Sequence, residues 1–197
     1  MGAGSMRGLP IRGFPKVGSR VGVIFVPTFP VGCGDSRENR YAVLLRYDSC
    51  MMMQPSTVYM QRCIELAQRA RQSADTLVGS LVVHNDQIIG EGVEAVRARL
   101  DVTAHAEIEA IRQACRNVHS LDLTGSVLYT TAEPCWMCSY AVRQTRISQV
   151  VIGRSVPSVG GFSSRHPILT DPDIEFWPSP PSVTCGVLGR ECEKLNI

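Results

Sequence analysis

Residues 131–138 read TAEPCWMC and place two cysteines three positions apart, directly after a proline. A Cys-x-x-Cys pair serves thiol exchange and metal binding equally well. Cys135 and Cys138 alone are therefore compatible with a redox pair, with half of a structural zinc site or with a catalytic metal site. The choice depends on which other side chains the fold brings to this pair.

A second short stretch, TAHAE at residues 103–107, carries the other candidate side chains. His105 and Glu107 stand at the start of a helix predicted over about 104–117, just as Cys135 and Cys138 start the next predicted helix. A helix N-terminus is a region of positive potential and favours a thiolate, which is the form of cysteine that binds metal. Both helix starts can thus contribute to one ion.

The number of ligands separates a structural site from a catalytic one. A structural zinc ion has four protein ligands, whereas a catalytic one has three and binds water at the fourth position. His105, Cys135 and Cys138 make three. Glu107 is close enough to reach the water, whose pKa zinc lowers to about 7, and a carboxylate there can take up and pass on its proton. We predict one catalytic Zn²⁺ per chain.

The apolar pattern of the chain predicts the order helix, strand, strand, helix, strand, helix, strand. The first helix extends from a cap at Ser56 to about Ser73, and a tight turn at 84–86 joins the first two strands. A final helix is expected after Ser182, with Cys185 and Cys192 on its packed side. This order indicates a mixed sheet flanked by helices.

The composition of the 197-residue chain is that of an ordinary globular protein, with 44% hydrophobic and 19% charged residues. No run of about 18 apolar residues exists, so no membrane-spanning helix is expected. Eight irregularly spaced cysteines favour free thiols or metal ligands in a reducing, cytoplasmic compartment over a disulfide scaffold.

The first fifty residues differ from the rest in charge and pattern. They carry a net charge of +4, the remainder carries −2, and their apolar residues show no period. We expect a disordered leader over 1–52, with a signal or transit peptide as the alternatives, a zinc domain over 53–161, and a tail and helix over 162–197 that pack on or cap this domain.

The pairing of His-Ala-Glu with Pro-Cys-x-x-Cys, one helix and one strand apart, resembles the cytidine and deoxycytidylate deaminase superfamily. The resemblance covers about residues 56–161. The stretches DVTAHAEIEAIR and LYTTAEPCWMCSYAVRQTRISQVVIG are most similar to the branch that contains tRNA adenosine deaminases and bacterial guanine deaminases.

This resemblance implies a three-layer α/β/α sandwich with a five-stranded mixed sheet, one zinc ion per subunit and a homodimer. It makes His105, Cys135 and Cys138 the zinc ligands and Glu107 the proton shuttle. It also makes the backbone N–H of Ala106 a candidate contact to the base.

One position departs from the branch. Eleven residues before the zinc histidine the branch commonly has an asparagine that reads the base or sugar, and this chain has Glu94. An ionised glutamate only accepts hydrogen bonds, so we expect Glu94 to accept one from the substrate; the alternative is a solvated loop residue. Trp136, His166 and Trp177 are further candidates for substrate contacts.

We expect a zinc-dependent deaminase of a small amino-heterocycle, a free nucleobase or nucleoside of purine type. A nucleic-acid partner is not expected, because residues 51–197 sum to −2 and RNA binding needs a basic surface. A tRNA adenosine deaminase is the alternative. A non-catalytic zinc module is a further alternative, with its fourth ligand from His84, Cys115 or His166.

Overall fold

The computed structural model describes residues 55–196. The expected leader over 1–52 lies outside the described residues. Within 55–196, no helix is long and apolar enough to cross a membrane.

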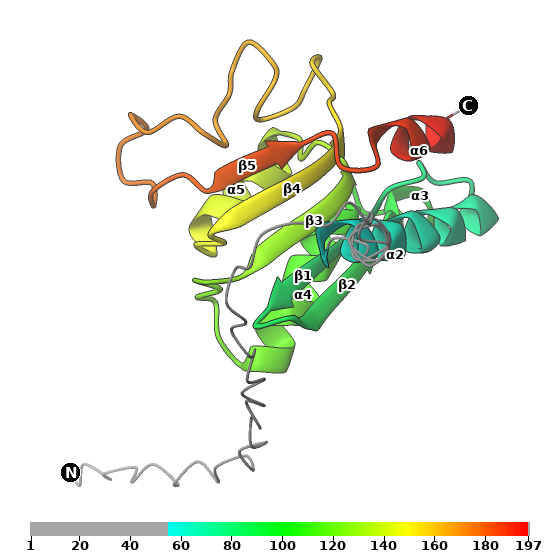
Figure 1. Cartoon of the computed structure of the whole chain (residues 1–197), viewed down its shortest axis with the longest axis horizontal. Helices are drawn as coiled ribbons and strands as arrows, with labels where there is room; N and C mark the ends of the chain where they lie inside the picture. The colour runs from blue at the N-terminus through cyan, green and yellow to red at the C-terminus, as the bar shows by residue number, and fades with distance from the viewer. Residues whose placement is uncertain (1–54, 197) are drawn as a thin grey trace, which may run out of the picture. The chain divides into compact units, whose positions relative to one another are not determined.

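The sheet has five strands in the order β2-β1-β3-β4-β5 (Figure 1). Strand β1 is antiparallel to both β2 and β3, and β4 is parallel to both β3 and β5. The sheet is therefore mixed, as expected. The strands are β1 (Gly79–His84), β2 (Gln87–Val93), β3 (Val127–Ala132), β4 (Gln149–Arg154) and β5 (Ser182–Cys185).

Helices cover both faces of this sheet because the strand residues alternate between two apolar cores. Val82 and Leu128 pack with residues of α4 and α5, whereas Leu81 and Tyr129 pack with residues of α2 and α6. The expected α/β/α sandwich is confirmed. The helices are α2 (Pro55–Arg69), α3 (Val96–Arg99), α4 (Ala106–Val118), α5 (Trp136–Gln144) and α6 (Gly189–Glu193), with 3-10 turns at Ala70–Ser73 and Lys194–Asn196.

A glycine sets how closely α4 approaches the sheet. A Cβ on Gly92 in β2 would lie 1.9 Å from the carbonyl oxygen of Ala106 and 2.5 Å from the nitrogen of Ala110. A side chain at Gly92 would therefore push the start of α4, and His105 before it, away from the strand ends.

The prediction of a final helix from Ser182 is wrong. Residues 182–185 form the edge strand β5 beside β4, and only Gly189–Glu193 is helical. The segment before β5 is rich in proline, which favours an extended backbone. Gly186, with φ of 92°, ends the strand. Cys185 is consequently exposed, whereas Cys192 is buried as expected. The boundaries proposed at 52/53 and 161/162 stay predictions.

Candidate active site

The two helix starts that carry the motif meet at one edge of the sheet. His105 is the N-cap residue of α4 and Cys135 that of α5, and neither side chain caps its own helix. Strands β2 and β3 both run antiparallel to β1 and so run in the same direction. The segments that follow them, which lead into α4 and α5, therefore leave the sheet at the same edge.

The distances within the motif fit a zinc ion. The Nδ1 atom of His105 lies 3.7 Å from Cys135 Sγ and 3.6 Å from Cys138 Sγ, and the two sulfurs are 3.6 Å apart. With bonds of about 2.3 Å to sulfur and about 2.0 Å to nitrogen, neighbouring ligands of a tetrahedral zinc ion lie about 3.5–3.8 Å apart. A disulfide would hold the sulfurs about 2.05 Å apart, so the two cysteines are not bonded to each other, and the nearby His105 Nδ1 favours a metal site over a redox pair.

Within residues 55–196, the side chains form one other group with metal-ligand spacing. It consists of Glu94, His105 and Glu107, whose ligand atoms lie within 4.8 Å of one another, and it shares its histidine with the first group. Thiolates favour zinc over hard cations, so His105 with Cys135 and Cys138 is the set that fits the expected metal.

The fourth ligand required by a purely structural zinc site does not come from the three residues considered for it. His84, Cys115 and His166 belong to neither metal-binding group. His84 lies at the end of β1, where its Nδ1 is 3.2 Å from Ser126 Oγ. The arrangement of three ligands beside a carboxylate thus favours the catalytic interpretation.

The electrostatics of the cluster favour a cation. A hydrogen bond from the Cys138 thiol holds the pKa of Cys135 at about 4, against the effect of burial and with help from His105. The hydrogen bond to Cys135 in turn raises the pKa of His105 to about 9, while burial opposes the rise. A metal ion held by these side chains would displace their protons, so binding is coupled to proton release.

Glu107 is buried against this cluster. Its Oε2 lies 3.6 Å from Cys138 Sγ and its Oε1 lies 3.3 Å from Thr130 Oγ1. Burial raises its pKa to about 7, and the negative charge of Cys135 adds to the rise. A carboxyl group with a pKa near neutrality can both take up and release a proton at physiological pH.

Glu94 is buried and is not a solvated loop residue. Its Oε2 accepts a hydrogen bond of 3.0 Å from the backbone N–H of Ala106. Burial raises the pKa of Glu94, although His105 and this hydrogen bond oppose the rise. The predicted contact between the Ala106 N–H and a substrate would have to replace the bond to Glu94.

Glu133 supports the loop before Cys135. Its carboxylate accepts hydrogen bonds from the backbone of Val156, Phe162 and Ser163 and from the Ser163 hydroxyl. Burial alone would raise the pKa of Glu133, but the hydrogen bonds outweigh it and hold the pKa below its usual value. The segment 156–163 is thereby fastened beside the start of α5.

Two of the predicted contact residues lie together, Trp136 on α5 and His166 just after this segment. The rings of Trp136 and His166 are 5.8 Å apart in an edge-to-face arrangement, and Trp136 donates through Nε1 to Ser164. Phe162 is 37% and Trp136 40% exposed. Trp136 directly follows Cys135 in the chain, and we call the exposed rings of Trp136, Phe162 and His166 the aromatic surface.

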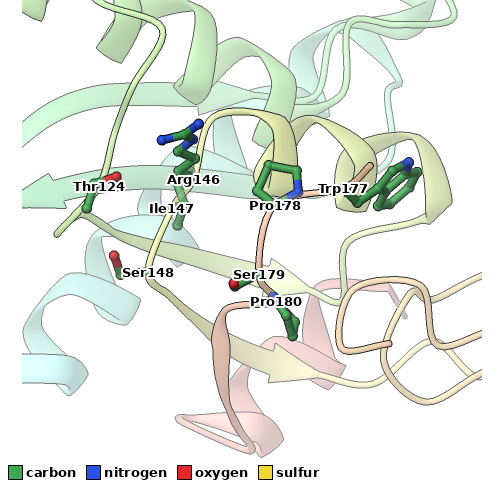
Figure 2. Close-up of a pocket in the computed structure, with 8 residues that line it drawn as sticks. All are labelled: Thr124, Arg146, Ile147, Ser148, Trp177, Pro178, Ser179 and Pro180. Carbon is green, nitrogen blue, oxygen red and sulfur yellow. The ribbon is translucent and has the colours of Figure 1, made fainter. Parts of the chain in front are cut away.

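Trp177 lies elsewhere. It lines a cavity of about 610 Å³ together with Ser148 and Thr124, which precede β4 and β3 respectively (Figure 2). Cys135 instead follows β3, so this cavity and the metal cluster lie at opposite ends of that strand. Trp177 packs on Tyr140 and on the Arg143 guanidinium, each with 5.1 Å between centres.

Two functional candidates escaped the sequence analysis. Ser80 in β1 and Thr130 in β3 are fully buried, and Ser80 Oγ donates to Thr130 Oγ1 over 2.8 Å. The available signal was a hydroxyl residue at an inward position in each of two apolar strands. In the sequence alone, such residues are ordinary for a strand. The structure shows that the pair contacts Glu107 through Thr130.

Comparison with known proteins agrees with this site. Residues 53–154 match the sequence profile of the cytidine and deoxycytidylate deaminase zinc-binding region. The tRNA-specific adenosine deaminase of Haemophilus influenzae is 37% identical over 139 residues, which are 70% of this chain and 79% of that protein. The enzyme of the same name from Aquifex aeolicus is 36% identical over 116 residues, 59% of this chain and 77% of that protein.

Solved structures match as well. One, from work on A-to-I editing by tRNA:A34 deaminases at the wobble position of transfer RNA, aligns over 71% of this chain and 99% of that chain, with a TM-score of 0.66 and 30% identity. A variant of NE0047 in complex with 8-azaguanine aligns over 73% of this chain and 82% of that chain, with a TM-score of 0.58 at 23% identity, and this likeness shows the fold alone.

These relatives correct two expectations. A small free heterocycle as the substrate and the absence of a nucleic-acid partner are both wrong, because the similar proteins are named for tRNA. The physical error lies in the use of net charge. A net charge of −2 over residues 51–197 says nothing about how the charges are distributed around the site. The expected homodimer stays a prediction.

Proposed function

The chain belongs to the cytidine and deoxycytidylate deaminase superfamily of zinc-dependent hydrolytic deaminases, and we propose that its substrate is an adenosine within a transfer RNA. The observation that carries the proposal is the 37% identity, over most of the chain, to a tRNA-specific adenosine deaminase. The residues that match the family profile, 53–154, contain the metal cluster with zinc geometry and the buried carboxyl group beside it.

The proposed reaction replaces the exocyclic amino group of adenine by oxygen. Water is consumed, the bond between the ring carbon and the amino nitrogen breaks, and inosine and ammonia are the products. His105, Cys135 and Cys138 would hold the zinc ion, which would supply the Lewis acid for activation of the attacking water.

Glu107 moves the protons. Its carboxylate takes a proton from the attacking water and delivers it to the ring nitrogen. It later delivers a proton to the departing amino group. Burial raises the pKa of Glu107 and a bound Zn²⁺ would lower it, so that the carboxylate can accept a proton. Glu94 and the Ala106 N–H stay candidates for contacts to the base, as a unit joined by their hydrogen bond.

The aromatic surface of Trp136, Phe162 and His166 is the proposed contact for the nucleotides next to the reactive adenosine. Bases in single-stranded RNA stack on aromatic side chains. Arg165 is exposed between Ser164 and His166, and no Asp or Glu occurs from residue 154 to residue 170. This local absence of acids is compatible with a phosphate backbone, whatever the net charge of the domain.

The test uses the full, zinc-loaded chain and a tRNA with adenosine at the wobble position. We expect one equivalent of ammonia per tRNA and inosine at that position alone. The same tRNA with guanosine at the wobble position is the control. A zinc-containing protein that leaves the adenosine unchanged would contradict the proposal.

A further inference from the structure

A chain of three buried polar groups connects strands β1 and β3 with α4. Ser80 and Thr130 are direct partners in the antiparallel register, and both are 0% exposed. Ser80 Oγ donates to Thr130 Oγ1 over 2.8 Å, and Thr130 Oγ1 lies 3.3 Å from Glu107 Oε1 and 2.9 Å from the carbonyl oxygen of Ala132. The chain of contacts ends at Glu107.

The surroundings of this hydroxyl pair are apolar. Two residues along each strand, on the same face of the sheet, stand Val82 and Leu128, which belong to the core beneath α4 and α5. A buried hydroxyl costs free energy unless it is hydrogen-bonded. Ser80 and Thr130 satisfy each other and the main chain, and within residues 55–196 Glu107 is the one side chain outside the pair with which they form a hydrogen bond.

The two oxygens of Glu107 have different neighbours. Oε1 faces Thr130, whereas Oε2 lies 3.6 Å from Cys138 Sγ at the metal cluster. The last torsion of a glutamate side chain has a broad energy profile and holds no preferred angle by itself. The orientation of the carboxylate plane therefore depends on what each oxygen contacts.

We propose that Thr130, supported by Ser80, is a positioning residue that holds Glu107 Oε1 and so presents Oε2 to the metal and substrate side. This proposal rests on the proton-transfer role of Glu107. Ser80 contributes by donating to Thr130 Oγ1, which leaves the single hydrogen of Thr130 free to point toward Glu107 or Ala132. The hydrogen bonds of the hydroxyl pair within residues 55–196 do not include His105, Cys135 or Cys138.

The decisive variant is Thr130→Val, which removes the hydroxyl and keeps the shape of the side chain. We expect kcat to fall about tenfold, since a misplaced catalytic group costs up to about 100-fold, while KM and the zinc content stay unchanged. Thr130→Ser should restore most of kcat. A crystal structure of Thr130→Val should show the Glu107 carboxylate rotated.

The neighbouring Thr131 offers a matched control. It is also buried, at 1% exposure, and its Oγ1 accepts a hydrogen bond from the backbone of Gly79 instead of contacting Glu107. Thr131→Val removes the same atoms from the same strand, so it should lower the melting temperature about as much as Thr130→Val and leave kcat unchanged. Ser80→Ala should lower kcat by about threefold, which is less than the loss of up to about 100-fold that a misplaced catalytic group can cause.

The outcomes separate this proposal from the proposed function. Equal kcat for Thr130→Val and the wild type, or an equal loss in Thr131→Val, would overturn the positioning role while wild-type tRNA deamination stands. A wild-type protein without tRNA activity would instead overturn the proposed function. If Thr130→Val does not fold, Thr130→Ala and Ser80→Ala provide the same comparison of kcat with stability.

Discussion

The two ends of strands β3 and β4 differ in the kind of polar group they carry. The end that leads into α5 holds the metal cluster and three buried carboxyl groups, Glu94, Glu107 and Glu133, each with a shifted pKa. The opposite end holds an open cavity of about 610 Å³ (Figure 2). Its charged lining residue, Arg146, is 63% exposed and lies 3.7 Å from Asp122.

In this fold, the reactive end of the strands is distinguished by its buried charged groups more than by the volume of a cavity. Burying a carboxyl group costs free energy that the protein recovers only through specific partners, and Glu107 has few. Such a group is retained for a reason other than stability. The cavity at the other end requires no comparable cost, because its polar groups remain in contact with water.

The largest expected effect at the metal end comes from Glu107→Gln. Glutamine keeps the shape but cannot move a proton, so kcat should fall by at least about 10²–10⁴-fold, with one zinc ion still bound. Activity on wobble-position adenosine and metal content on the same sample measure both. Glu109→Gln is the control: Glu109 is also buried on α4 but pairs with Arg99 and Arg112. Near-normal turnover in Glu107→Gln would remove the distinction between the two ends.

A second, smaller effect is expected from Glu133→Gln. The amide would place a donor against the N–H groups that the carboxylate now accepts, which should cost about 2–4 kcal/mol of unfolding free energy at pH 7. Because the pKa of Glu133 is held below its ordinary 4.5, the stabilisation is present above that pH and is lost as the pH falls through the folded-state pKa.

Denaturant unfolding of the wild type and Glu133→Gln between pH 3 and 7 checks this prediction. The difference in unfolding free energy should be greatest at pH 7 and should narrow below about pH 4.5. Ser163→Ala, which removes one of the hydrogen bonds to Glu133, should cost only about 1 kcal/mol. A difference that is constant over this pH range would mean that the Glu133 charge does not fasten the loop.

The metal end was readable from the sequence because its side chains come in short, spaced motifs. Three residues within the motifs, His105, Cys135 and Cys138, converge as the motif spacing and the helix starts predicted. Strands β1 to β4 followed from their apolar runs.

What the sequence could not provide depends on pairing between distant segments. Strand β5 has four residues at a sheet edge and owes its conformation to β4, so its apolar positions also fitted a helical period. Thr130 is recognisable only once its distance to Glu107 is known. Trp177 and His166 belong to the same Pro-rich segment, yet Trp177 lines the cavity and His166 packs against Trp136.

The last contrast between the two ends concerns two tryptophans. The effects expected from their substitution are the smallest of those predicted. Trp136 and Trp177 are each part of an aromatic pair, but only Trp136 belongs to the metal end. Loss of a stacked base costs about 1–3 kcal/mol, so Trp136→Ala should raise KM for the tRNA about tenfold and leave kcat unchanged.

Trp177→Ala should leave both unchanged and lower the unfolding free energy by about 1–2 kcal/mol, because it removes contacts to Tyr140 and Arg143. Steady-state kinetics and denaturant unfolding of both variants decide the matter. A rise in KM for Trp177→Ala equal to that for Trp136→Ala would place the cavity end in contact with the RNA as well.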